Sequence, residues 1–258
     1  MIICIYTPTM EGFLSAFFEC YSKKIVPEII TCESNEYQVG LEYELLEVTP
    51  DSEKAMRVEK GIIKKIGSDG FYDIIRAYLS GDSNKEMIIF RYLIAVFKHG
   101  QKAQEMVNDK RIIDFNDLVR LVGGEAHRMK GFMRFKETSS VKIGNNVVEG
   151  KIYYAPFSPD HNIIEFMLDY FSQRNSETQF IIHDTARGLF GLYNGDDWRV
   201  ISMDEPVEIT LADGEQLVAD LFKEYYNTVT IASRKNKRLQ DGYLPRRYRK
   251  YLTEFEYK

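Results

Sequence analysis

Apolar side chains recur every three or four residues through most of the first 110 positions, a spacing typical of one face of a helix. Two short apolar runs, at residues 1–6 and 43–48, interrupt this spacing and predict strands. We therefore expect the region 1–110 to be mostly helical and to pack on a small strand pair. The expected helices cover residues 11–24, 52–66, 71–79 and 85–98.

The segment 116–135 has the clearest helical pattern of the chain. Wound at ~100° per residue, it separates an apolar side from a cationic side. Gly123 and Gly131 lie on the cationic side, where each costs about 1 kcal/mol against alanine. They indicate that a neighbouring helix, or a phosphate or other ligand, approaches the backbone there. The apolar side comprises Leu118, Leu121, Val122, Met129, Phe132 and Met133, and the cationic side Arg120, His127, Lys130 and Arg134.

After residue 133 the pattern changes to short apolar runs separated by turn residues. The segments 185–188 and 194–197 have the composition of hairpin turns, so the strands on either side of each are expected to be antiparallel. The chain is therefore predicted to have an α+β fold, with an antiparallel sheet and flanking helices in the region 111–232. The expected strands are 133–137, 147–155, 179–184, 189–193 and 198–201, the helices 163–173 and 214–226, and the linkers 108–114 and 139–146.

The third region, 233–258, concentrates the positive charge of the chain. Between Arg234 and Lys250 there are eight Lys or Arg residues and one acid, Asp241, whereas the whole chain has 34 basic and 39 acidic residues. Removing these eight cations and one acid leaves 26 basic and 38 acidic residues, a net charge of −12. This segregation is typical of a surface that binds a polyanion such as nucleic acid. The alternative is a solvated tail.

Aromatic residues between the cations favour an ordered segment over a solvated tail. Tyr243, Tyr248, Tyr251 and Phe255 provide rings on which unpaired bases can stack. We expect the segment to pack on the body through Leu239, Leu244, Tyr248 and Leu252, and the three regions to form one integrated unit. The predicted nucleic-acid-binding residues are Arg120, His127, Lys130, Arg134, Arg234, Lys235, Lys237, Arg238, Arg246, Arg247, Tyr248, Arg249 and Lys250.

Several classes of protein are disfavoured by what the sequence lacks. The three cysteines have no Cys-x-x-Cys spacing and the four histidines are dispersed, so neither a disulfide framework nor a metal site is expected. Phosphate loops and dinucleotide fingerprints are missing, so no cofactor is expected. The longest apolar runs are too short to span a membrane, and the first residues do not resemble a signal peptide. We expect a cytoplasmic protein.

Three residues are candidates for catalysis. His127 lies on the cationic side of the helix and is a candidate general base or hydrogen-bond donor to a phosphate. Asp184 follows His183 before a turn, which suits either metal-dependent hydrolysis or capping of the turn. Glu125 falls within the apolar stripe, so it is predicted to be buried and paired with Arg128, Arg187 or an arginine of the C-terminal region. General acid or base chemistry is the alternative for Glu125.

Four stretches together resemble a bacterial family. They are residues 11–16, 124–135, 182–188 and the closing pair 234–236 with 244–252. The chain is similar to DNA-metabolism or DNA-repair proteins that are commonly encoded beside a radical-SAM partner, and whose domain is elsewhere fused to a uracil-DNA-glycosylase-like protein. The resemblance implies association with DNA repair or modification and supplies no catalytic residue.

Together these patterns predict a DNA-binding protein that serves as an accessory or substrate-presenting partner of a second enzyme, with the DNA possibly single-stranded. A hydrolase acting on DNA, either glycosylase-like or nuclease-like, is the first alternative. A protein-interaction module with a basic docking tail is the second. Whether the chain is itself an enzyme stays open at this point.

Overall fold

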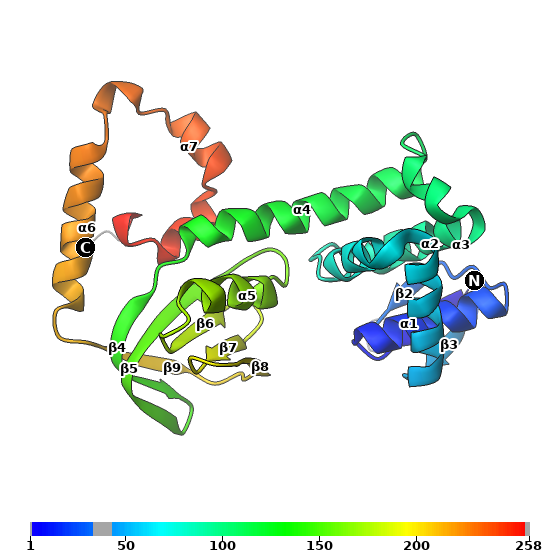
Figure 1. Ribbon diagram of the computed structural model, residues 1–258, viewed down its shortest axis with the longest axis horizontal. Coiled ribbons are helices and arrows are strands. Elements are labelled where there is room, and N and C mark those ends of the chain that lie inside the picture. Colours follow the sequence, from blue (N-terminus) through cyan, green and yellow to red (C-terminus); the bar gives the residue numbers. More distant parts are fainter. Residues whose placement is uncertain (1, 33–42, 256–258) are drawn as a thin grey trace. The chain divides into compact units, whose positions relative to one another are not determined.

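The computed structural model describes residues 2–32 and 43–255 and forms two compact units, 1–123 and 124–258 (Figure 1). The boundary between the units falls within helix α4, Lys110–Phe132. Helices combine with a mixed sheet, so the predicted α+β class is confirmed. The region boundaries expected near residues 110 and 232 stay predictions.

The N-terminal unit is built on a small parallel sheet. Strand β1, Ile2–Tyr6, lies between β2, Ile29–Thr31, and β3, Glu44–Val48, and both pairings are parallel. The expected strand pair is thus a three-stranded sheet. Strand β2 has only three residues, too few for an alternating pattern to be visible in the sequence.

Three α-helices and one 3₁₀ helix of the described chain precede α4 in this unit. Helix α1, Met10–Ser22, begins after Thr9, whose hydroxyl accepts a hydrogen bond from the amide of Gly12, and Phe13 and Phe17 anchor it in the core. Helix α2, Ser52–Tyr78, joins the two helices expected at 52–66 and 71–79. A break lies between them at Gly67, whose φ of 79° is left-handed. The remaining helices are α3, Lys85–His99, and the 3₁₀ helix η1, Gly100–Glu105.

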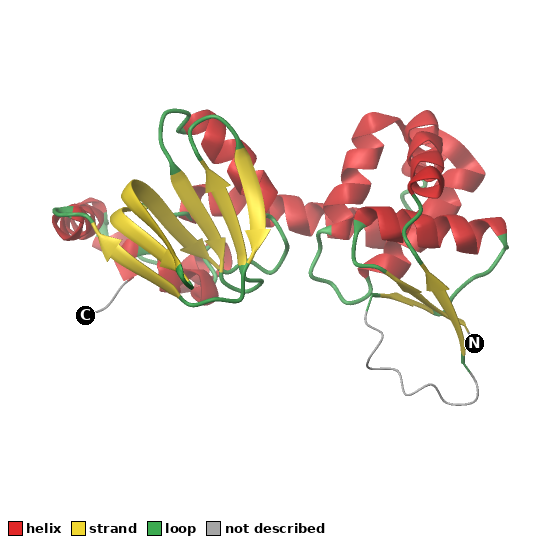
Figure 2. Cartoon of the chain, turned by 90° about the horizontal axis from the view of Figure 1, so that it is seen from below, coloured by secondary structure: helices red, strands yellow, loops and turns green. Residues whose placement is uncertain are grey.

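The C-terminal unit contains a six-stranded sheet of order β8-β7-β6-β5-β4-β9, drawn in yellow in Figure 2. Every pairing is antiparallel except that of β5 with β6, so the sheet expected to be antiparallel is mixed. Helix α5, Ile164–Arg174, connects β5 to β6 and allows a parallel return, which a tight hairpin cannot provide. The strands are β4, Lys136–Ile143; β5, Asn146–Phe157; β6, Phe180–Asp184; β7, Leu189–Tyr193; β8, Trp198–Ser202; and β9, Val207–Leu211.

The two segments that were expected to be linkers, 108–114 and 139–146, consist largely of regular secondary structure, so this prediction is wrong. Residues 139–146 form most of β4 and the tight connection to β5, and residues 110–114 are the first turn of α4. Polar residues in these stretches look like loop in the sequence, but they occupy strand and helix positions that face solvent. Strand β9 was missed because it is an edge strand with few buried side chains.

The C-terminal segment packs on the rest of its unit. It runs through α6, Glu215–Val229; η2, Ala232–Arg234; α7, Lys237–Tyr243; η3, Arg246–Tyr251; and η4, Thr253–Phe255 (Figure 1). Of the expected anchors, Tyr248 and Leu252 are buried and Leu244 is half-buried. Leu239 is 57% exposed, so its expected role as an anchor is wrong.

Helix α4 buries most of the apolar stripe expected for it. Leu118, Val122, Met129 and Met133 are buried, whereas Leu121 is 46% exposed and is a correction to the prediction. Within residues 2–32 and 43–255, we find no helix of the length and apolarity required to cross a membrane.

Candidate nucleic-acid interface

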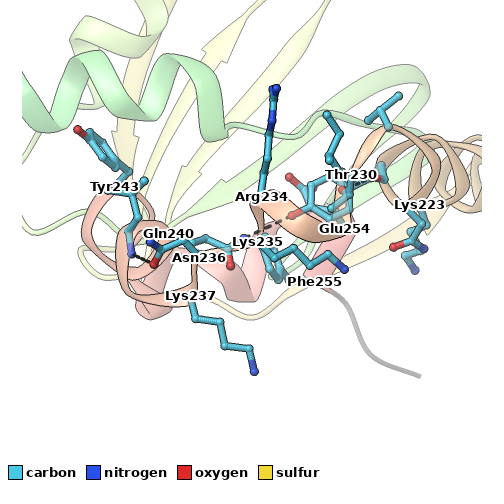
Figure 3. A pocket seen from close by; sticks show the side chains of 15 residues that line it. Lys223, Thr230, Arg234, Lys235, Asn236, Lys237, Gln240, Tyr243, Glu254 and Phe255 are labelled. Carbon is cyan, nitrogen blue, oxygen red and sulfur yellow. Dashed lines mark hydrogen bonds between the residues drawn. The ribbon is translucent and has the colours of Figure 1, made fainter.

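A cavity of the C-terminal unit lies within the basic segment. It has a volume of about 810 Å³ and is enclosed by the second half of α6, by η2, by the start of α7 and by η4 (Figure 3). Asn236 fixes one wall, because its side-chain oxygen accepts a hydrogen bond of 3.0 Å from the amide of Leu239 and so caps α7. The cavity is therefore formed by ordered helix ends.

Four cations line this cavity: Lys223, Arg234, Lys235 and Lys237. In the described part of the chain, none of the four has an ion-pair partner. The one carboxylate in the lining, Glu254, is held at 2.8 Å by Arg134, which also lies over the ring of Phe222. The cavity therefore presents uncompensated positive charge. We call it the cationic cavity.

Rings and amides complete the lining. Tyr226 and Phe255 meet edge to face with centroids 6.1 Å apart, while Tyr243 is 72% exposed at the rim. Asn227 and Gln240 add amide groups. Cations suit phosphate oxygens, and exposed rings suit the faces of unpaired bases.

A second hollow of about 400 Å³ adjoins the first. It is lined by Asn236, Arg238, Leu239, Gly242 and Tyr243, three of which it shares with the cationic cavity. Arg238, a predicted binding residue, belongs to this hollow. The two hollows thus extend over both sides of the start of α7.

The cations of η3 have different partners. Arg246 and Arg249 both bind Asp241, and Arg249 also donates to the carbonyl oxygen of Leu244 and lies over the ring of Phe255. These two ion pairs lower the pKa of the Asp241 carboxyl, mainly through Arg249. Arg249 is thus part of the internal structure of the segment.

A cluster around Glu125 holds η3 against the unit. The Glu125 carboxylate is 1% exposed and accepts hydrogen bonds of 2.8 Å from the amides of Asp160 and His161. It also accepts a hydrogen bond from the hydroxyl of Tyr248. Arg247 donates to that hydroxyl and pairs with the carboxylate of Asp160. Burial, followed by the bond to Glu125, raises the pKa of Tyr248 to about 12.

The prediction that Glu125 is buried is confirmed. The prediction that an arginine pairs directly with its carboxylate is wrong. Two backbone amides and one hydroxyl satisfy the carboxylate, and Arg247 reaches it only through Tyr248. The reason is that the loop after β5 turns its amides toward α4, a feature that side-chain types do not reveal. Asp160 was missed for the same reason.

The turn after β6 is tied to the same loop. Asp184 is buried, accepts from the amide of Ala186 at 3.0 Å, and pairs with Arg187 at 2.9 Å. Burial raises the pKa of Asp184, while Arg187 opposes that shift. Arg187 also donates to the carbonyl oxygens of Pro159 and Asp160. Asp184 therefore caps the turn, as one of its two interpretations proposed.

Segments far apart in the sequence thus meet at residues 158–161. Helix α4 contributes Glu125, the turn after β6 contributes Arg187, and η3 contributes Arg247 and Tyr248. Thr185 of the same turn is 2.7 Å from the hydroxyl of Tyr251. We call this arrangement the loop clasp. It joins three of the four stretches that carried the family resemblance.

The other predicted binding residues are dispersed. Arg120 pairs with Asp117 on the surface of the N-terminal unit. Lys130 lies over the ring of Tyr170 at 4.6 Å, and Lys250 over that of Tyr251 at 5.1 Å. A methyl group placed on Gly131 would meet no atom of the described chain within 4 Å, so a packed helix is not the reason for this glycine.

The catalytic candidates are not assembled with one another. Glu125 and Asp184 are both engaged in the structural bonds given above, and His127 is exposed on α4 without a contact to either in the parts of the chain described. His183 is 2.6 Å from the hydroxyl of Tyr154 and stacks on Phe190, and burial lowers its pKa to about 4. Across residues 2–32 and 43–255, we find no group of three potential metal ligands.

Sequence reasoning missed part of the cationic cavity. Lys223, Tyr226 and Asn227 line it from α6, which was predicted only as a flanking helix. Their spacing of three and four residues places Lys223 near both Tyr226 and Asn227 on one helix face, but only the folded segment shows that η4 faces them.

A comparison with protein-family models identifies a family for this chain. The family described as "Domain of unknown function (DUF4130)" matches residues 83–254, which include the second, third and fourth of the resembling stretches. No curated protein matches the chain.

Proposed function

The chain belongs to the DUF4130 family, whose function is unknown, and we propose that it binds single-stranded nucleic acid in DNA metabolism as an accessory or substrate-presenting partner of another enzyme. The cationic cavity carries this proposal. It combines four cations that have no ion-pair partner within the described chain with three aromatic rings, from α6, α7 and η4. The adjoining hollow extends the same surface with Arg238 and shares the ring of Tyr243.

The rings favour a single strand over a duplex. Stacking on a ring requires the face of a base, and in a duplex both faces are covered by neighbouring base pairs. Tyr243, at 72% exposure, is the ring that an incoming base meets first. Lys235 and Lys237 then lie within the same lining to neutralise the adjoining phosphates.

The link to DNA repair and to a radical-SAM enzyme is part of the proposal and rests on the resembling stretches. Three of these stretches meet in the loop clasp, which supports a shared structural role for them. An accessory role is favoured because Glu125 and Asp184, two of the three catalytic candidates, are engaged in structural bonds. The alternative function, hydrolysis of DNA, is tested by the direct assay described below.

The test is a binding titration with a triple charge reversal. We expect Arg234→Glu, Lys235→Glu and Lys237→Glu together to abolish binding to a fluorescent DNA strand of about 20 nucleotides, without a change in melting temperature. The matched control is Lys60→Glu, Lys64→Glu and Arg199→Glu, which alters net charge equally at three exposed positions. Equal affinity in the two triple variants would exclude the cationic cavity as the binding surface.

The salt dependence and the competitors define the ligand class. Each phosphate contact to a single strand contributes a slope of about −0.7 in log affinity against log salt. We expect the parent to prefer the single strand over the same sequence as a duplex. If an acidic peptide of equal charge competes as well as DNA, the cavity is a docking site for an acidic protein instead.

Catalysis is tested separately. Labelled single- and double-stranded DNA, undamaged and base-damaged, is incubated with the protein with and without Mg²⁺, and we expect no product. Product that disappears in Asp184→Asn or His127→Ala, with binding intact, would replace the accessory role with a hydrolase.

A further inference from the structure

Helix α6 exposes an apolar surface that the described chain does not cover. None of its fifteen residues is buried. Five apolar side chains between 52% and 63% exposed recur along it at spacings of three and four residues, on one side of the helix. They are Leu217, Val218, Leu221, Tyr225 and Val229, and we call them the α6 stripe.

The opposite side of α6 accounts for its internal contacts. Glu215 accepts a hydrogen bond from the amide of Glu137 on β4, and Tyr226 packs against Phe255 of η4. These two residues lie away from Leu217 and Leu221 when the helix is wound at ~100° per residue. The stripe is therefore a surface additional to the one that attaches α6 to its unit, and it is separate from the four cations of the cationic cavity.

Acidic side chains border the stripe along one edge. Asp220 and Glu224 are exposed and lie three residues beyond Leu217 and Leu221 respectively, which places them beside these leucines. Asp213 precedes the helix, four residues before Leu217. A partner that covers the stripe thus gains from cations along the corresponding edge of its own groove.

The acidic edge argues against a second copy of the chain as the occupant. Two copies of α6 that pair across a two-fold axis are either antiparallel or parallel. In the antiparallel pair Asp220 and Glu224 would face their own counterparts, and like charges in contact are repulsive. In the parallel pair they would face the opposite edge of the stripe, where α6 has Phe222 and Val229 and no Lys or Arg. A different protein has no such restriction.

We propose that the α6 stripe is the docking helix for a different protein, which presents an apolar groove with a basic rim. The mode is that of an amphipathic helix laid in a groove, with Leu217, Leu221 and Tyr225 as its anchors. This inference does not depend on nucleic-acid binding, because the stripe and the cationic cavity use different residues of α6, with only Val229 common to both.

The partner is identified by site-specific photo-crosslinking in the source organism. A benzophenone amino acid replaces Leu221 in the full-length chain, and the matched control replaces Gln216, an exposed residue on the polar side of the same helix. We expect position 221 to capture one defined protein that position 216 does not. That protein is then purified and its affinity for the parent chain is measured by calorimetry.

Two variants examine the chemistry of the contact. Leu221→Asp should weaken binding of the purified partner by at least about 30-fold, as expected for an anchor residue, whereas Gln216→Ala, which adds no charge beside Asp220, should change it little. Asp220→Lys with Glu224→Lys should weaken it several-fold at low salt. Both variants should keep the melting temperature of the parent, because these side chains are exposed.

Several outcomes would overturn the proposal. Capture of a second copy, supported by self-association in sedimentation that Leu221→Asp abolishes, would make the stripe a homodimer interface. Equal capture at positions 221 and 216, or equal affinity of the partner for Leu221→Asp and the parent, would show that the stripe docks nothing. Loss of nucleic-acid binding with partner binding intact would contradict only the proposed function.

Discussion

The cations of η3 and three of the four in the cationic cavity come from the same short stretch of sequence and have different environments. Arg247 and Arg249 have carboxylate partners, Asp160 and Asp241. In the described part of the chain, Lys235 and Lys237 have none and line a cavity instead. A run of positive charge is therefore not one functional unit. Some of its members hold the segment in place so that the others remain available.

The largest expected effect concerns the loop clasp, which the paired cations support. Glu125→Ala leaves two amides and the Tyr248 hydroxyl without their acceptor in a buried site, so we expect a loss of about 3 to 5 kcal/mol of stability. Chemical denaturation is followed by fluorescence of Trp198, the single tryptophan, which lies on β8 of this unit. Glu165→Ala, at an exposed position of α5, is the control.

A direct test of the comparison removes one paired cation and one cavity cation in separate variants. Arg247→Ala should cost about 1 kcal/mol of stability, because it removes a partly exposed ion pair and a hydrogen bond to Tyr248. Lys235→Ala should change stability by no more than about 0.5 kcal/mol but should reduce the salt slope of nucleic-acid binding by about 0.7. The opposite pattern would mean that the paired cations are the binding residues.

Mild acid should lower the stability of the unit that contains the six-stranded sheet, but it should leave nucleic-acid binding by the cationic cavity nearly unchanged. Burial holds the pKa of His183 at about 4, below the ordinary value of 6.5, so the unfolded chain binds a proton between these two values that the folded chain does not. Stability should therefore fall as the pH is lowered from 6.5 toward 4, and His183→Gln should reduce that slope in denaturation measured at several pH values. None of the residues lining the cavity is a histidine, so binding should change little over the same range.

The smallest expected effect comes from a substitution that frees two paired arginines for contact with nucleic acid. Asp241→Asn removes the shared partner of Arg246, which is 81% exposed, and of Arg249. We expect a several-fold gain in affinity for a single strand and a steeper salt slope, by up to about 0.7 for each phosphate that a released arginine contacts. Unchanged affinity would mean that η3 lies outside the path of the strand.

The strongest patterns in the sequence predicted the elements that have strong periodicity or obvious turns. Helix α4, the strands around the turn 185–188 and the packed aromatic residue Tyr248 were found in this way. Strand β2 is too short and β9 too exposed to have such a pattern. The parallel pairing of β5 with β6 depends on the path of α5 across the sheet, which no local pattern records.

The composition of the basic segment was evident in the sequence, but the division of its cations was not. That division depends on where Asp160 and Asp241 lie after folding. Asp241 is the one acid among these cations in the sequence, but the sequence does not show which arginines it pairs with, and Asp160 does not stand out from the other acids of the chain. In the same way, the sequence placed Glu125 inside an apolar stripe and so predicted its burial. It could not show that backbone amides would take the place of an arginine.

The loop clasp also has a consequence for the order in which this unit is made. Glu125 and Tyr248 are separated by 123 residues, so at about 5 to 20 residues per second roughly 6 to 25 s pass between their synthesis. During that interval the carboxylate has no access to one of its three partners, and the loop after β5 lacks Arg247. The C-terminal unit therefore cannot be completed before η3 has been synthesised, and until then the nascent chain exposes the parts of α4 and of the loop after β5 that η3 contacts.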